Sequence, residues 1–191
     1  MIDFNEMLGK YAELCVKVGV NLQKGQPLVI NSPIEGADFV RLVAEYAYEI
    51  GAKQVHVNWN DEVLTKMKYK NAPMEVFENF PKWYADGLEE FAEDGAGFLS
   101  IYSEDPELLK DMDPKKIAAH NKSSSTALKN YRKYTMNDIN AWCVVSIPTR
   151  GWAKKVFPDV SEDEAMEKLW DAIFTATRID ADEPVAAWKS H

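Results

Sequence analysis

A strand–helix–strand pattern within one short stretch constrains the fold of this 191-residue chain more than any other feature. Residues 27–31 form a short apolar run that ends in a turn, and residues 36–50 carry apolar side chains at helical spacing. Residues 53–59 then form a second strand-like run. Two strands joined by one crossover helix are parallel, and the crossover is almost always right-handed. The pattern therefore predicts a βαβ unit.

Two further apolar runs follow the βαβ unit, and helical segments separate them. The segment 61–94 is helical in pieces, because Pro73 and Pro81 interrupt it. Near-continuous apolar strands separated by helices are typical of a parallel sheet that is covered on both faces. We therefore predict an α/β fold, a three-layer doubly wound domain with a mainly parallel sheet of at least four strands. The predicted strands are 27–31, 53–59, 97–102 and 141–147.

Charge is distributed unevenly along the second half of the chain. Residues 86–113 contain ten acidic residues and one basic residue, whereas residues 114–137 contain six basic residues and no acidic one. A long polar helix is predicted over 114–134. We favour solvent-exposed helix faces as the explanation of both segments. The alternative is that the basic helix, with Ser123–Ser125 at its middle, faces a cleft or a partner.

The composition argues against several classes of partner. The 22 basic and 31 acidic residues give a net charge of −9, whereas a protein that binds duplex nucleic acid needs a basic face. The apolar runs are too short to span a bilayer and the start lacks the basic region of a signal peptide, so we expect a cytoplasmic protein without a membrane partner. Cys15 and Cys143 lie far apart in apolar runs, which predicts buried thiols.

The sequence contains none of the compact motifs that mark a metal or catalytic site. The three histidines are His56, His120 and His191, and none lies within a ligand spacing of another. The spacing does not exclude a metal site whose acidic ligands converge from distant positions in the sequence. His56 alternates with two valines and should point to the opposite sheet face, where an ordinary strand histidine is favoured over a catalytic one. The glycine fingerprint for dinucleotides and the Gly-x-Ser-x-Gly elbow are both absent.

Topology nevertheless indicates where a ligand would bind, because open parallel sheets bind ligands beyond the carboxyl ends of their strands. Side chains at these ends are candidates for contacts with a substrate or with another domain. Serine and aspartate are also common residues at the start of turns and helices, and we favour that role for Ser32, Asp61 and Ser103. The candidate pairs are Asn31–Ser32, Asn60–Asp61, Ser103–Glu104 and Thr149–Arg150.

Two ordered runs of residues resemble a known family. The first comprises Tyr11–Leu14, Val18–Gly25, Ser32–Glu35, Phe39–Arg41, Ala47–Tyr48 and Gly51–Lys53. The second comprises Trp152–Pro158, Leu169–Trp170, Ala172–Phe174, Arg178 and Pro184–Trp188 with His191. Together they resemble the amino-terminal half of the thermophilic metalloaminopeptidases of the aminopeptidase T / PepS type. The resemblance covers essentially the whole chain.

The resemblance implies that this chain does not catalyse a reaction by itself. Members of this family are about twice as long and use two divalent metal ions, of the zinc or cobalt type, to activate a water that attacks the first peptide bond. The metal ligands belong to the carboxyl-terminal half, so no catalytic or metal-ligating residue is carried over to this chain, and the substrate-binding residues stay open. Residues 1–180 would form the α/β amino-terminal domain, and residues 181–191 would begin a linker helix to an absent catalytic domain. In that helix we expect Asp182 as the cap.

Three functional hypotheses follow. In the first, the chain is the amino-terminal domain of a two-metal aminopeptidase that releases amino-terminal residues from peptides. It would bind no cofactor itself and would be inactive alone, but it would shape the substrate cavity and support assembly. Its partners would be its own carboxyl-terminal domain, peptide substrates and a second copy in a homodimer. The alternatives are a stand-alone small-molecule or nucleotide-binding domain and a non-catalytic interaction module.

Overall fold

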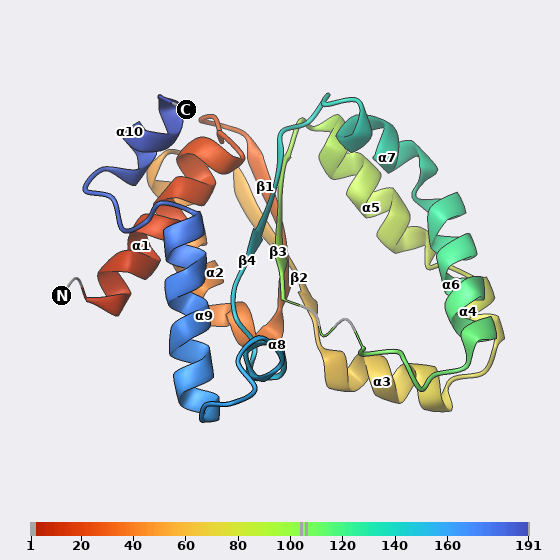
Figure 1. Cartoon of the computed structure of the whole chain (residues 1–191). Helices are drawn as coiled ribbons and strands as arrows, with labels where there is room; N and C mark the ends of the chain where they lie inside the picture. Colours follow the sequence, from red (N-terminus) through yellow and green to blue (C-terminus); the bar gives the residue numbers. More distant parts are fainter. Residues whose placement is uncertain (1–2, 104, 106, 191) are drawn as a thin grey trace.

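The computed structural model describes residues 3–103, 105 and 107–190. Its centre is a four-stranded parallel sheet with the strand order β2-β1-β3-β4. The strands are β1 (Pro27–Pro33), β2 (Gln54–Asn60), β3 (Gly97–Tyr102) and β4 (Trp142–Ser146). Helices lie on both faces of the sheet (Figure 1). The predicted three-layer α/β fold is confirmed, and strand ends differ from the prediction by no more than two residues.

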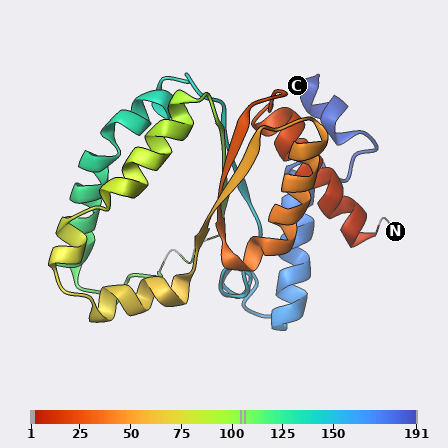
Figure 2. The ribbon, with the colours of Figure 1, turned by 180° about the vertical axis from the view of Figure 1, so that it is seen from behind.

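The helices fall into two groups, one on each face of the sheet (Figure 2). The first group consists of α1 (Phe4–Leu14) with its π-helical continuation η1 (Cys15–Gly19), α2 (Ala37–Glu49) after the short turn η2 (Ile34–Gly36), α8 (Arg150–Val156), α9 (Glu162–Ala176) and α10 (Pro184–Lys189). The second group consists of α3 (Glu62–Asn71), α4 (Glu75–Glu78), α5 (Lys82–Glu93), α6 (Pro114–Ala127) and α7 (Lys129–Met136). The two groups cover the sheet very unequally.

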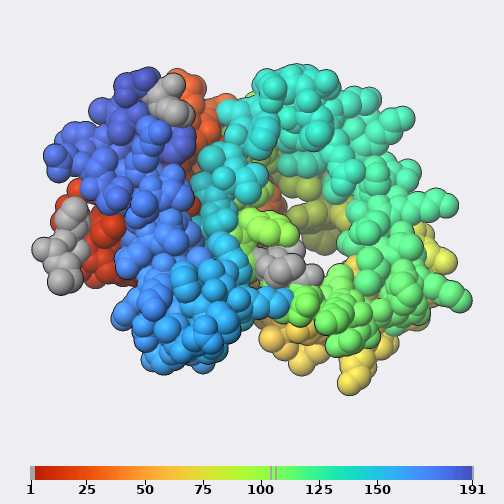
Figure 3. Space-filling view, viewed as in Figure 1, coloured from red at the N-terminus to blue at the C-terminus, as the bar shows by residue number. Residues whose placement is uncertain are grey.

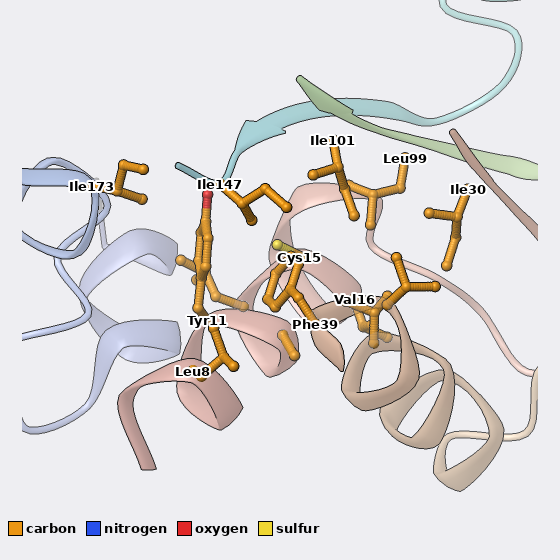
Figure 4. Close-up of a cluster of buried hydrophobic side chains, with 14 of the residues drawn as sticks. Leu8, Tyr11, Cys15, Val16, Ile30, Phe39, Leu99, Ile101, Ile147 and Ile173 are labelled. Atoms are coloured by element: carbon orange, nitrogen blue, oxygen red, sulfur yellow. The ribbon is translucent and has the colours of Figure 1, made fainter. Parts of the chain in front are cut away.

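The main hydrophobic core lies between the sheet and the first group of helices (Figure 4). Tyr11 of α1 is 1% exposed, and its ring stacks on Phe39 of α2 with the centroids 5.0 Å apart. Phe174 of α9 meets the same tyrosine edge-on. Full burial of a large apolar side chain contributes roughly 1.5–3 kcal/mol. The sheet supplies the side chains of Leu28, Ile30, Leu99 and Ile101.

The opposite face has a much smaller core. Val29 and Phe98 of the sheet pack with Leu88 and Ala92 of α5, and the ring of Tyr131 meets Phe98 edge-on at 5.2 Å. These contacts lie over the beginning of the strands, where α5 and α7 approach the sheet (Figure 1). Further along the strands, α3, α4 and α6 stand away from the sheet as an arch. Among the described residues, no helix therefore packs closely on the carboxyl-terminal half of this sheet face.

In the helices α3 to α7, one sequence prediction is wrong and another is confirmed. The polar helix expected over 114–134 is divided at Leu128 into α6 and α7, neither of which has a fully buried residue. The Ser123 hydroxyl donates a 2.7 Å hydrogen bond to the Phe77 carbonyl, so α6 packs on α4. The predicted breaks at Pro73 and Pro81 are confirmed, because α3 ends before the first proline and α5 begins after the second.

The carboxyl-terminal helix α10 packs on the main core. The indole N–H of Trp188 donates a 2.7 Å hydrogen bond to the Thr177 carbonyl, and the guanidinium of Arg178 lies over its ring. Cys15 is buried and Cys143 is half-buried, and neither forms a disulfide. No helix in the described part of the chain is long and apolar enough to cross a membrane.

Candidate functional site

Three polar side chains lie side by side on the sheet face under the arch. The parallel register pairs Asn31 of β1 with Asn58 of β2 and with Ser100 of β3. The amide Nδ2 of Asn58 donates to Oδ1 of Asn31 at 3.1 Å, and Nδ2 of Asn31 donates to Oγ of Ser100 at 3.4 Å. We call these three side chains, together with His56, the polar row.

His56 extends the polar row toward the small core. Its Nε2 lies 3.1 Å from Oδ1 of Asn58, and its ring centroid lies 5.0 Å from that of Phe91. With the proton on Nε2, every hydrogen bond of the row runs in the same direction, from His56 to Ser100. Val55 and Val57 pack against the main core instead. The predicted position of His56 on the opposite face is therefore confirmed.

The polar row contrasts with the other face of the same strands. One position away from Asn31 and Ser100, Ile30, Leu99 and Ile101 are all buried and apolar. A buried polar group is costly unless it is hydrogen-bonded, and a sheet face covered by helices is normally apolar. The side chains of Asn31, Asn58 and Ser100 are only half-buried. These three hydrogen-bonded side chains therefore lie where the sheet face is only partly covered.

A cavity of about 480 Å³ lies over the polar row, and we call it the hollow. It is lined by Asn31, Asn58, Asn60 and Ser100, by the rings of Tyr84 and Tyr102, and by neighbouring strand residues. The space-filling view shows the opening between the sheet and the arch (Figure 3). None of the described lining residues carries a charge. Burial raises the pKa of the Tyr84 hydroxyl.

The structure brings one of the four predicted strand-end pairs, and one residue of a second pair, to the hollow. Asn31, Ser32 and Asn60 all line it, although Asn31 lies inside β1 and not at its end. Ser32 is 2% exposed and lies within β1, not in the turn that was predicted, and its hydroxyl donates to the Pro33 carbonyl at 2.9 Å. Asp61 caps α3 by accepting from the backbone N–H groups of Val63 and Leu64.

Thr149 and Arg150 lie elsewhere. The Thr149 hydroxyl accepts from the N–H of Trp152 at the start of α8 and also lies 3.3 Å from the Ser103 carbonyl. Arg150 forms exposed ion pairs with Glu162 and Asp163 at 3.4 and 3.1 Å. Thr149 and Arg150 line a separate cavity of about 550 Å³ between α1, α8 and α9. Glu104 lies outside the described residues.

The described residues do not fit a metal site. Nowhere in residues 3–103, 105 and 107–190 do three or more His, Cys, Asp or Glu side chains gather where they could hold a metal ion. His120 packs against Phe80 and Tyr69 in the arch, where burial and then Lys68 lower the pKa of its imidazole. His191 lies outside the described residues.

Sequence reasoning missed Asn58 and Ser100 as members of one site. The signal was present in β2, where His56, Asn58 and Asn60 alternate with apolar residues. An alternating strand has one polar face. The strand order was the missing information, because only the placement of β1 between β2 and β3 brings the two asparagines and the serine together.

Comparisons with known proteins give a consistent result. Residues 4–191 match the family described as thermophilic metalloprotease (M29). The chain is 55% identical to aminopeptidase 2 of Geobacillus stearothermophilus, over 96% of this chain and 45% of that protein. It is 50% identical to aminopeptidase AmpS of Bacillus subtilis, over 100% of this chain and 47% of that protein.

A solved structure is also similar. Wild-type AmpT from Thermus thermophilus superimposes with a TM-score of 0.89 at 37% identity, over 99% of this chain and 46% of that one. The chain therefore spans less than half the length of the relatives that it matches.

Proposed function

Because this chain belongs to the thermophilic metalloprotease family M29, we propose that it is the amino-terminal domain of an aminopeptidase that releases amino-terminal residues from peptides. The family resemblance predicted from the sequence is confirmed by the match over residues 4–191. The observation that carries the proposal is the combination of high identity over the whole chain with coverage of less than half of proteins named aminopeptidases. We also propose that the protein is cytoplasmic.

The chemistry is assigned to the part of the protein that this chain does not contain. Two divalent metal ions of the zinc or cobalt type would be held by the carboxyl-terminal half, and none of the residues described above would ligate them. The catalytic residues would likewise belong to that half. Two ions can polarise a carbonyl and lower the pKa of the attacking water. Within this chain the role is to shape the substrate cavity and to support assembly, including a homodimer.

The division of the chain follows the same proposal. Residues 1–180 form the α/β domain, and residues 181–191 begin the linker helix to the catalytic domain. The packing of Trp188 and Val185 on the main core supports a fixed direction for this helix. A linker that begins from a packed helix would hold the second domain at a defined position relative to the hollow.

Hydrolysis of aminoacyl-p-nitroanilides, with and without added zinc or cobalt, tests the proposal. Residues 1–191 and the full-length parent are assayed in parallel, with a chelator as the control for metal dependence. We expect metal-dependent release of amino acids by the parent and none by residues 1–191. Turnover by the purified short chain would overturn the assignment of chemistry to the absent half. An inert parent would overturn the aminopeptidase assignment itself.

A further inference from the structure

The polar row has hydrogen-bonding capacity that the described residues do not use. Each side-chain amide of Asn31 and Asn58 has two hydrogens on Nδ2, and one of them donates within the row. The second hydrogen of each amide has no partner among the described residues, and neither has the hydroxyl proton of Ser100. These three donors lie beside the hollow and are available to a ligand.

The lining of the hollow restricts the class of that ligand. A phosphate or carboxylate group is normally bound by arginine, by lysine or by several backbone N–H groups, and the described lining contains no cationic side chain. A peptide group is neutral and offers one donor and one acceptor. Side-chain amides match it because they also donate and accept. The rings of Tyr84 and Tyr102 provide apolar surface for the side chains of such a ligand.

The size and shape of the hollow agree with a short segment of peptide. Its volume of about 480 Å³ falls within the range of roughly 300–1,000 Å³ for small-molecule sites. It adjoins a second cavity of about 450 Å³, with which it shares Asn58, Trp59 and Tyr84. The two cavities together follow the polar row from Ser100 to His56.

We propose that the hollow binds the neutral backbone of a peptide, with Asn31 and Asn58 donating to its carbonyl oxygens. The inference rests on the proposed function, because peptides are the substrates proposed for the parent protein. It adds a binding site within this chain and names the side chains that form it. Neither asparagine takes part in chemistry in this proposal.

The test is a titration of ¹⁵N-labelled residues 1–191, followed by nuclear magnetic resonance, with trialanine blocked by an acetyl group and a methylamide. We expect saturable shifts of the side-chain amide signals of Asn31 and Asn58. Asn58→Leu removes the donors without adding charge, and it should weaken binding roughly tenfold, as expected for the loss of a hydrogen bond. Asn121→Leu, at an exposed position of α6, is the matched control and should bind as the wild type does.

Ser100→Ala provides a second variant if Asn58→Leu fails to fold, and we expect it to weaken binding as well. The inference is overturned if the wild type shows no saturable shifts, or if both hollow variants bind as tightly as Asn121→Leu. It is also overturned if inorganic phosphate produces the shifts and the peptide does not. The blocked peptide has no free amino terminus. Its binding is therefore measured independently of hydrolysis, and failure here leaves the aminopeptidase proposal standing.

Discussion

The hydroxyl group of Tyr11 bonds both backbone polar groups of Ser146. It donates to the Ser146 carbonyl at 3.0 Å and accepts from the Ser146 N–H at 3.3 Å. Tyr11 belongs to α1, and Ser146 is the last residue of β4, which forms one edge of the sheet. One buried side chain therefore joins the first helix to the last strand, 135 residues away in sequence.

Removal of this hydroxyl should destabilise the fold measurably. Tyr11→Phe keeps the ring contacts with Phe39 and Phe174 but leaves both backbone groups of Ser146 without this partner. We expect a loss of about 1–3 kcal/mol in the free energy of unfolding, measured by urea denaturation. Tyr102→Phe is the control, because its ring is 56% exposed, and it should change stability by less than about 0.5 kcal/mol. Equal effects of the two substitutions would refute the role given to Tyr11.

Two buried tyrosines should make the fold sensitive to alkaline pH. Burial raises the pKa of Tyr131 to about 12 and raises that of Tyr11 well above its usual range. Since the unfolded chain loses these protons near pH 10 while the folded chain retains them, stability is complete below pH 10 and falls as pH rises further. Each group accounts for at most about 1.4 kcal/mol per pH unit.

The measurement is urea denaturation between pH 8 and pH 11 of the wild type, Tyr131→Phe and Tyr11→Phe. Each variant should show a shallower decline than the wild type above about pH 10, because one titrating group has been removed. A decline of unchanged slope in both variants would assign the alkaline sensitivity to other groups, such as the lysines.

Substitution of alanine for two of the glycines should change the stability of the fold in opposite directions. A Cβ atom at Gly36 would lie 2.6 Å from Oγ of Ser32 and 2.8 Å from Cδ1 of Ile147, so in Gly36→Ala at least one of these side chains has to move. Gly87 lies inside α5, where an added Cβ atom would meet open space. Gly87→Ala should therefore stabilise the helix by about 0.5–1 kcal/mol.

Thermal unfolding of both variants checks this pair. We expect a lower midpoint for Gly36→Ala and a higher one for Gly87→Ala, with overpacking costing about 1–3 kcal/mol at the first position. A neutral result at Gly36 would mean that Ser32 and Ile147 move aside without cost.

Trp188 should hold α10 in place. Trp188→Ala removes the hydrogen bond to Thr177 and the packing on the main core, so the backbone amides of 185–189 should exchange with solvent faster. The amides of α9 should be unaffected in the same experiment. Trp83→Ala is the control, since Trp83 is 76% exposed. Unchanged exchange in α10 would show that other contacts fix this helix.

The strands were predictable because β1, β3 and β4 contain short apolar runs and β2 alternates apolar and polar side chains. Residues 97–102 were predicted with the observed bounds, whereas 27–31 was predicted two residues short, since Ser32 and Pro33 resemble a turn. The division of 114–134 at Leu128 could not be predicted. Neither half of that segment buries an apolar stripe, so hydrophobic spacing carries no signal there. The cap of α10 was also misplaced, because Asp182 was expected where the structure has Glu183.

The site was only partly predictable for a different reason. Local sequence identifies residues at strand ends, and it indicated Asn31, Ser32 and Asn60, which line the hollow. Local sequence does not give the order of strands in the sheet. It also does not show that α3, α4 and α6 stand away from the sheet. Asn58 and Ser100 are separated by 42 positions in the chain, and they become members of one row only through β1 between them.

The unequal covering of the two sheet faces has a consequence for local unfolding. The arch helices α3, α4 and α6 and the adjoining α7, which are described over their full lengths, have only Tyr69 and Phe77 as buried residues. Segments with few buried contacts open at a lower free energy than the core. We therefore expect the arch to open as a separate cooperative unit, which would exchange its amide protons and admit a bulky molecule while the sheet and the main core remain folded.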